Sequence, residues 1–295
     1  MPTRPWLFAL IALACICNVA SAQAAIKTQA VEYKQGDTVL EGFLAWDDTQ
    51  QGKRPGVLVV HEWDGLGDYI KMRAEMLAKL GYVAFAPDIY GKDVRPANMQ
   101  QSAQESSKYA KDRSLMRQRV EAGLEQLKSN PLVDTTRIVA IGYCFGGTAA
   151  LELGRSGADI AGVVTFHADL SNPTPEDAKN IKARVLVLQG ANDPYAKPAV
   201  VDKFEDEMRA TKVDWQFVSY SGARHGFSNP RKHDPEHGLV YDEKADQRSW
   251  KAMQDFFAEI LQRNRRNLSV VIAGLVPAIS ISKARPCDLC DEIAV

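Results

Sequence analysis

Cys144 lies between two glycines in residues 142–146, whose sequence is GYCFG. A short apolar run, residues 137–141, comes directly before this segment and is predicted to form a buried strand. A nucleophile on such a sharp strand-to-helix turn needs small residues two positions before and after it, because a Cβ there would collide with neighbouring backbone. Gly142 and Gly146 meet that requirement. The segment therefore predicts a nucleophile elbow in which cysteine replaces the usual serine.

A structural role for Cys144 is the alternative, because small buried cysteines are common in protein interiors. However, the helix predicted over residues 145–153 would point its N-terminus at the sulfur. The positive end of the helix dipole favours a thiolate over a thiol at that position. A thiolate also needs less help from a base than a serine hydroxyl does.

An acid and a histidine follow Cys144 in the chain order that a nucleophile elbow requires. Asp193 comes after the predicted strand 185–188, and His225 comes after the predicted strand 215–220. Asp193 would orient His225, which would take the thiol proton and later activate water or protonate a leaving group. Either residue alone is equally compatible with an ordinary loop. Their order and placement favour a Cys-His-Asp triad.

An oxyanion hole needs a backbone N–H after the nucleophile and a second one from the loop after an early strand. Phe145 supplies the first. The predicted strand 57–60 leads into a loop that contains Trp63, whose N–H would be the second. The side chains of His61 and Glu62 would lie near the same site, although ordinary loop polarity explains them equally well.

Short apolar runs alternate with longer amphipathic ones along most of the chain, after a hairpin over 29–46 that turns at 35–37. Predicted strands are 57–60, 83–86, 137–141, 162–166, 185–188 and 215–220. Predicted helices are 68–80, 112–129, 145–153, 199–210 and 243–260. This alternation indicates a single α/β domain with a mostly parallel central sheet and helices on both faces. In such sheets ligands gather at the carboxyl ends of the strands, where the candidate residues lie.

Residues 1–24 have the features of a cleavable signal peptide: a basic start, an apolar run and small residues before a cleavage site. A membrane anchor is the alternative, but the run is shorter than the ~20 residues that a span needs. We therefore expect a periplasmic or secreted protein with no membrane span after cleavage. The mature chain would keep Cys144, Cys287 and Cys290, too few for a disulfide scaffold. An unpaired thiol in an oxidising compartment points to a chemical role for Cys144.

The chain has 295 residues, which suits one catalytic domain over 25–262. The 36 Lys+Arg and 37 Asp+Glu give a net charge of -1 without a basic face, which argues against nucleic acid as a partner. After the last predicted helix the composition changes, and residues 263–295 are predicted to be an extension outside the fold. Cys287 and Cys290 form a lone C-x-x-C there, which is weak evidence for a redox or metal site.

Taken together, these residues make the chain, over 28–261, similar to the dienelactone hydrolase family. The most specific matching segments are 59–65 (VVHEWDG), 86–91 (APDIYG), 142–147 (GYCFGG) and the loops that carry Asp193 and His225. The cysteine in the elbow separates this family from the many serine hydrolases of the same fold. The resemblance implies an α/β-hydrolase fold and hydrolysis of an enol lactone or related small-molecule ester. It implies a thioester acyl-enzyme, with no cofactor and no metal.

The resemblance also implies a catalytic role for Glu62, whose counterpart in the family pairs with the resting thiol and helps to form the thiolate when substrate binds. A neutral resting thiol suits an exported enzyme, since it is less open to oxidation. Family members that act on dienelactone hold its carboxylate with two arginines, and Lys92 and Asn229 occupy the corresponding positions here. Lys lacks the bidentate fork of Arg, and Asn carries no charge. Tyr90 and His167 are further candidates for contact with the substrate.

The leading hypothesis is an exported carboxylic ester or lactone hydrolase. A thioesterase or peptidase that uses the same triad is an alternative within the enzymes. An exported binding protein on a catalytically inactive hydrolase scaffold is an alternative from another class. A third alternative is a redox system formed by Cys144 with Cys287 and Cys290.

Overall fold

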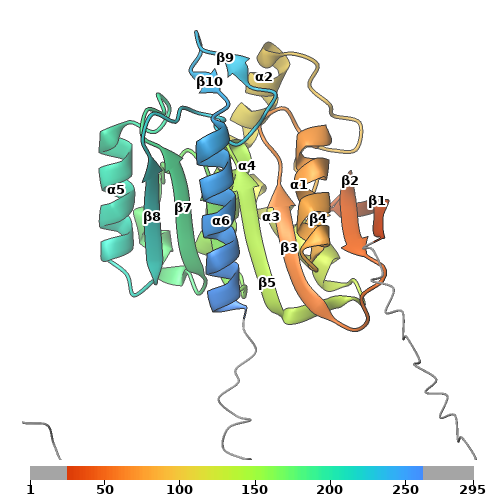
Figure 1. Ribbon diagram of the computed structural model, residues 1–295. Coiled ribbons are helices and arrows are strands. Elements are labelled where there is room, and N and C mark those ends of the chain that lie inside the picture. The colour runs from red at the N-terminus through yellow and green to blue at the C-terminus, as the bar shows by residue number, and fades with distance from the viewer. Residues whose placement is uncertain (1–24, 262–295) are drawn as a thin grey trace, which may run out of the picture. The chain divides into compact units, whose positions relative to one another are not determined.

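The computed structural model describes residues 25–261, in which eight strands form one central sheet (Figure 1). Their order across the sheet is β1-β2-β4-β3-β5-β6-β7-β8. β1 and β2 form an antiparallel hairpin, β2 pairs antiparallel with β4, and all other neighbours are parallel. The strands are β1 (Ile26–Gln35), β2 (Thr38–Asp47), β3 (Arg54–Val60), β4 (Val83–Ala86), β5 (Val133–Tyr143), β6 (Gly162–Phe166), β7 (Arg184–Gly190) and β8 (Trp215–Tyr220).

Helices cover both faces of the sheet, which confirms the predicted fold class (Figure 1). α1 (Asp68–Lys79) and α6 (Glu243–Ile260) lie on the near face in Figure 1, and α3 (Arg113–Lys128) and α4 (Phe145–Arg155) lie behind the sheet. The remaining elements are α2 (Met99–Lys111), η1 (Pro175–Asn180), α5 (Pro198–Arg209) and a small ribbon of β9 (His233–Asp234) with β10 (Leu239–Val240). The predicted signal peptide and C-terminal extension, with Cys287 and Cys290, lie outside the described residues.

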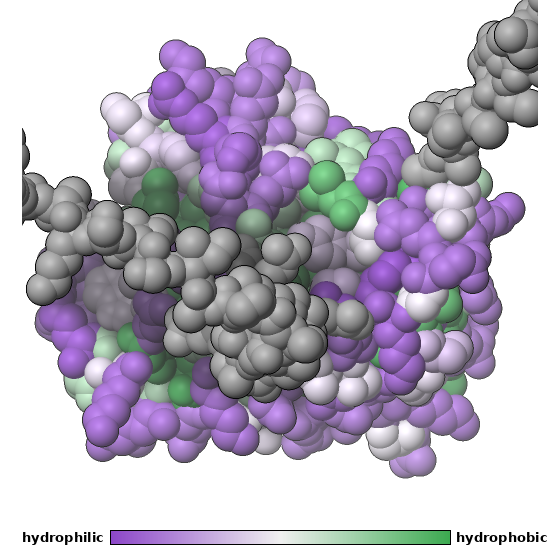
Figure 2. Space-filling model, turned by 60° about the horizontal axis from the view of Figure 1, so that its bottom comes forward, coloured by the Kyte–Doolittle hydropathy of each residue, from purple (hydrophilic) through white to green (hydrophobic). Residues whose placement is uncertain are grey.

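The parallel strands β3, β4, β6 and β7 are largely apolar because helices bury both of their faces. Every residue of β4 and β6 is buried, and β3 and β7 are buried except for one residue each near the start. No helix among residues 25–261 combines the length and the apolar character needed to cross a membrane. Figure 2 turns the lower end of Figure 1 forward, and most of the coloured surface there is hydrophilic, with apolar residues in small scattered patches.

α4 is longer than predicted, because Gly154 lies inside the helix instead of ending it. A Cβ at Gly154 would come 3.3 Å from the Val163 side chain, so the glycine permits close packing of the helix on β6. The helix ends at Arg155, and Gly157 follows with a φ of 85°. Gly157 is therefore the glycine that stops the helix, as left-handed backbone after a helix C-terminus commonly does.

α2 was not predicted from the sequence. Ser102 and Tyr109 are its two buried residues, so it has almost no apolar stripe to reveal a helical period. Its start does carry a signal: the Asn98 side chain accepts a hydrogen bond from the Gln101 N–H, and the Gln101 side chain accepts one from the Ala97 N–H. This exchange is a variant of the capping box, which marks a helix N-terminus.

Candidate active site

Cys144 occupies the turn between β5 and α4 with strained backbone, φ 54° and ψ -119°. The flanking glycines are required by close contacts between backbone segments. A Cβ at Gly142 would lie 1.9 Å from the carbonyl oxygen of Gly146, and a Cβ at Gly146 would lie 2.3 Å from that of Val60. The steric argument made from the sequence therefore holds in the structure: this turn excludes any side chain two positions from the cysteine.

The three predicted triad residues meet at the carboxyl edge of the sheet. Nε2 of His225 lies 3.1 Å from Sγ of Cys144, and Nδ1 of His225 lies 2.9 Å from Oδ2 of Asp193. Asp193 follows β7 and His225 follows β8, so strand pairing brings together residues that are far apart in sequence. The distances are those of a nucleophile, a base and an orienting acid.

The charges on either side of His225 determine its protonation. Burial alone would lower the pKa of the imidazole, but the Cys144 sulfur and the Asp193 carboxylate outweigh this effect and raise the pKa to about 10.

Asp193 is fixed by two further hydrogen bonds. Its Oδ2 accepts one from the Gln189 side chain at 2.8 Å, and its Oδ1 accepts one from the Tyr195 N–H at 2.8 Å. The Tyr195 ring also packs edge-on against the His225 ring, with centroids 4.8 Å apart. The acid is therefore buried, fully engaged and unable to rotate away from His225.

The N–H groups of Phe145 and Trp63 are candidate oxyanion donors, because neither donates to an acceptor within residues 25–261. Hydrogen bonds from Tyr90 and His61 hold the loop that carries Trp63. The Tyr90 hydroxyl donates to the Trp63 carbonyl at 2.8 Å. Nδ1–H of His61 donates to the Glu62 carbonyl at 2.6 Å, while its Nε2 accepts from the Ile89 N–H at 3.2 Å. His61 and Tyr90 thus fix the backbone of this loop.

Glu62 does not contact the thiol, although the resemblance led us to expect that pairing. Its carboxylate accepts a hydrogen bond from the Asn229 side chain at 2.7 Å and forms an ion pair with Nζ of Lys232 at 3.1 Å. Burial alone would lower the pKa of Lys232, but the nearby Glu62 outweighs this effect and raises it. In this structure the sulfur of Cys144 is instead paired with His225.

A cavity of about 220 Å³ opens next to Cys144. Trp63, Phe145 and His225 line it. Lys232 also lines it and was missed from the sequence, because it reaches the site only through the fold of the loop after β8.

The four residues predicted to bind substrate do not line this cavity. Lys92 is a surface residue that pairs with Glu32, and Asn229 is held by Glu62. The Tyr90 hydroxyl is used by the Trp63 carbonyl. His167 is fully buried behind His225, with ring centroids 5.1 Å apart and its Nε2 bonded to Ser228 at 2.8 Å. Tyr90, His167 and Asn229 therefore contact residues of the site, whereas Lys92 pairs with the surface carboxylates Glu32 and Glu41.

Comparison with known proteins shows the family to which the chain is similar. The sequence profile of the dienelactone hydrolase family matches residues 40–261. A putative carboxymethylenebutenolidase from Methylorubrum extorquens is 30% identical, over 81% of this chain and 86% of that protein. The solved structure m3DLH is 42% identical, with a TM-score of 0.78 over 81% of this chain and 100% of that one. A dienelactone hydrolase-like promiscuous phosphotriesterase from metagenomic libraries is 39% identical, with the same coverage and TM-score.

Proposed function

The chain belongs to the dienelactone hydrolase family, and we propose that it cleaves esters or lactones with Cys144 as nucleophile, His225 as base and Asp193 as orienting acid. Membership of this family makes it a hydrolase that acts on ester or lactone bonds. The observation that carries the proposal is the unbroken line of contacts from Asp193 through His225 to Cys144, whose sulfur faces the cavity.

The first half of the reaction follows from these contacts. The thiolate of Cys144 attacks the carbonyl carbon, and the N–H groups of Trp63 and Phe145 stabilise the oxyanion that forms. When the carbon–oxygen bond breaks, Nε2 of His225 gives its proton to the leaving alkoxide, and a thioester remains on Cys144. Asp193 holds the ring in the orientation that this transfer needs.

The second half releases the acid. His225, now neutral, takes a proton from a water molecule as that water attacks the thioester carbonyl. The second tetrahedral intermediate occupies the same oxyanion hole, and its collapse returns the thiolate to Cys144. In a lactone the alcohol and the acid are parts of one molecule, so a single product leaves at this step.

Cys144→Ala and Cys144→Ser test this assignment on a panel of short esters and lactones that includes a dienelactone. Cys144→Ala should abolish turnover and leave the circular dichroism spectrum unchanged. Rapid acid quenching of the wild type during turnover should trap one acyl group on Cys144, as measured by mass spectrometry. Full activity in Cys144→Ala would overturn the assignment of the nucleophile.

Phosphotriester cleavage is a second candidate activity at the same site, because the relative at 39% identity is described as a promiscuous phosphotriesterase. A thiolate next to two N–H donors can attack phosphorus as it attacks a carbonyl carbon. A dialkyl aryl phosphate in the same panel tests this candidate. Release of the aryl alcohol by the wild type but not by Cys144→Ala is the expected result.

We also propose that the enzyme is exported, on the strength of the sequence of residues 1–24 alone. Expression of the full chain in a Gram-negative bacterium should yield a mature protein in the periplasmic fraction that begins near residue 25. Mass spectrometry of the intact protein measures the mature start. A cytoplasmic protein that retains residues 1–24 would contradict export.

A further inference from the structure

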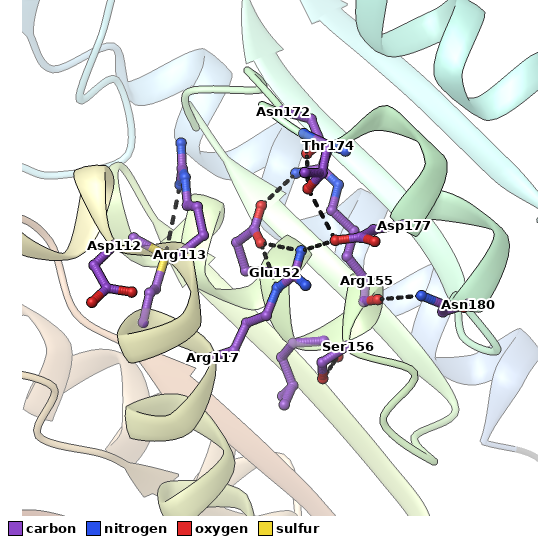
Figure 3. Close-up of polar contacts among 12 residues, drawn as sticks. Asp112, Arg113, Arg117, Glu152, Arg155, Ser156, Asn172, Thr174, Asp177 and Asn180 are labelled. Carbon is purple, nitrogen blue, oxygen red and sulfur yellow. Dashed lines mark hydrogen bonds and ion pairs between the residues drawn. The ribbon is translucent and has the colours of Figure 1, made fainter.

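Two buried polar clusters lie on opposite faces of the central sheet. The first lies on α3 and α4, behind the sheet in Figure 1, and Figure 3 shows its ion pairs. There Arg117 donates to Glu152 at 2.8 Å and to Asp177 at 2.7 Å, and none of these three side chains lines the cavity next to Cys144. The second cluster lies on the face that α1 and α6 cover, and it ends at the ring of His225. It is therefore the second cluster that touches the proposed triad.

His167 is the member of the second cluster that meets His225. It comes directly after β6, is fully buried, and has a φ of 42°, in the left-handed region. Among residues 25–261, Cys144 is the only other residue besides glycines with a positive φ. Such backbone is unfavourable for a residue with a side chain, and it persists at functional sites where the surrounding structure holds it. The conformation of His167 thus points to a role in the site.

The carboxyl end of β6 also fixes the backbone of the nucleophile. The Cys144 N–H donates to the Phe166 carbonyl at 2.9 Å. The next residue, His167, donates its own N–H to the Leu188 carbonyl at 2.9 Å, on the strand β7 that leads to Asp193. The main chain at His167 is therefore held by the same strands that carry the triad.

Two aromatic rings confine the imidazole of His225. The His167 ring packs edge-on against it from the interior, with centroids 5.1 Å apart and an interplanar angle of 65°. The Tyr195 ring packs against it from the cavity wall, at 4.8 Å and 63°. Edge-to-face contacts between rings are directional, so both restrict the plane of the imidazole. Tyr195 is 51% exposed and can move, whereas the buried His167 cannot.

Ser228 fixes the ring of His167. Nε2 of His167 lies 2.8 Å from Oγ of Ser228, while Nδ1 is buried and has no hydrogen-bond partner among residues 25–261. A proton on Nε2 leaves no buried ring N–H unpaired, so Nε2 is the donor to Ser228. The Ser228 hydroxyl then donates to the Tyr69 hydroxyl at 2.8 Å, which donates to the Ser228 carbonyl at 3.1 Å. Each donor in this chain thus has an acceptor.

Arg73 connects this chain to two helices. From α1 it donates through Nη2 to the Ser228 carbonyl at 2.6 Å, and the same nitrogen pairs with Asp246 of α6. Its Nε donates to the Tyr69 hydroxyl at 3.3 Å. Hydrogen bonds from a charged donor are stronger than neutral ones. The loop from His225 to Ser228 is therefore anchored to both helices on this face of the sheet.

The surroundings of His167 keep its ring neutral. Burial lowers the pKa of His167 well below its ordinary value, and the neighbouring charges of His225, Lys232 and Arg73 also lower it. Tyr143 on β5, with its ring centroid 6.2 Å away, is neutral as well, because burial raises its pKa. A neutral ring at this place packs against the imidazole of His225 without charge repulsion when His225 carries a proton.

We propose that His167 is a positioning residue, which holds the His225 ring within hydrogen-bond distance of Cys144 and is itself held by Ser228. The inference rests on the proposed function, in which His225 is the base. His167 does not line the cavity and has no contact with substrate in this role. Its loss should therefore slow turnover and leave substrate binding unchanged.

His167→Asn tests the proposal, because asparagine tolerates left-handed backbone but lacks the ring. For a phenyl ester, kcat should fall about 10- to 100-fold with KM unchanged, as expected when a reacting group is slightly misplaced. The pKa of His225, about 10 in the wild type, should fall toward its ordinary value of 6.5, because the imidazole is no longer held next to the Cys144 sulfur and the Asp193 carboxylate. NMR titration of the imidazole measures this pKa without any turnover.

Ser228→Ala is a second variant that keeps the His167 ring and removes only the hydroxyl that fixes it. It should change kcat and the pKa of His225 in the same direction as His167→Asn, with a fall in kcat of about 2- to 10-fold. This variant tests the proposal even if His167→Asn does not fold. Asp177→Asn is the control, since it weakens the first cluster. It should lower the midpoint of thermal unfolding and leave kcat, KM and the pKa of His225 unchanged.

The outcomes separate positioning from general stability. A His167→Asn protein with a lower unfolding midpoint but normal kcat and normal His225 pKa would show a purely structural role and overturn the proposal. An equal fall of kcat in Asp177→Asn would also overturn it, because destabilisation alone would then explain the loss.

The titration of His225 separates this inference from the proposed function. If the wild type hydrolyses no ester but His167→Asn lowers the pKa of His225, the proposed function fails and the positioning role stands. If the wild type hydrolyses esters and His167→Asn changes neither kcat nor this pKa, the positioning role fails and the proposed function stands.

Discussion

Replacing Tyr90 with Phe removes one hydroxyl from the support of the candidate oxyanion hole. That hydroxyl donates at 2.8 Å to the carbonyl of Trp63, the residue whose N–H is a candidate oxyanion donor. The ring itself should stay in place, because it packs against His61, Phe145 and Tyr109 with centroids 4.9 Å, 5.5 Å and 5.3 Å away. The substitution therefore loosens the Trp63 backbone and changes little else.

Two reference values bound the fall in kcat that we expect for Tyr90→Phe. A hydrogen bond contributes about 0.5–1.5 kcal/mol net, which corresponds to a ~2- to 13-fold fall in kcat if the transition state loses all of it. Complete removal of an oxyanion donor costs about 100- to 1,000-fold. The Trp63 N–H remains present in Tyr90→Phe, so we expect the smaller fall, with KM unchanged because Tyr90 does not line the cavity.

Two measurements isolate the cause. Turnover of a phenyl ester gives kcat and KM, and the rate of Cys144 alkylation by iodoacetamide gives the reactivity of the thiolate without forming an oxyanion. Tyr90→Phe should lower kcat and leave alkylation unchanged. Tyr109→Phe is the control, since its hydroxyl donates to the Tyr90 carbonyl at 3.2 Å and not to the Trp63 loop. A raised KM with normal kcat, or slower alkylation, would refute the reasoning.

Three further predictions concern the elbow, the proposed triad and the buried ion pair between Arg155 and Glu207. Gly142→Ala should prevent correct folding, since its Cβ would lie 1.9 Å from a backbone oxygen; a soluble variant with the native circular dichroism and full activity would contradict this. In Cys144→Ala the pKa of His225 should fall well below about 10, because the sulfur is the largest contribution that raises it, and NMR titration of the imidazole measures this. Since the folded pKa exceeds the unfolded value of about 6.5, the imidazolium stabilises the wild type most below that pH, and this stabilisation fades as the pH rises toward 10. Glu207→Gln should cost about 3–5 kcal/mol in urea unfolding, because it leaves Arg155 buried and partly unpaired, whereas replacing both residues with apolar ones should cost much less.

The sequence predicted the elements that carry the triad because each is marked by a strong local pattern. β4, β6 and β8 match their predicted bounds. β4 and β6 are short, mostly apolar runs, whereas polar residues interrupt β8. The placement of Asp193 and His225 followed from chain order and from the rule that parallel strands end at one edge. Those two constraints were sufficient to predict that Cys144, Asp193 and His225 lie close together.

The substrate contacts could not be predicted in the same way. Lys92 and Asn229 were chosen by position relative to family motifs, but which way a loop residue points depends on its tertiary partners. Lys232 reaches Glu62 through a loop with only two short strands. Ser106, Ser107 and Ala110 reach the cavity on α2, a helix that the apolar pattern does not reveal. Such contacts have no periodic signature in a single sequence.

α2 buries few of its residues against the rest of the fold. It contributes Ser106, Ser107 and Ala110 to the wall of the cavity, yet it buries only Ser102 and Tyr109. Replacement of its exposed residues should therefore change the free energy of unfolding only slightly. The triad loops do not have this freedom, since each is anchored in the central sheet. Substrate range in this protein can thus evolve, or be engineered, by exchange of a single surface segment while the chemistry stays fixed.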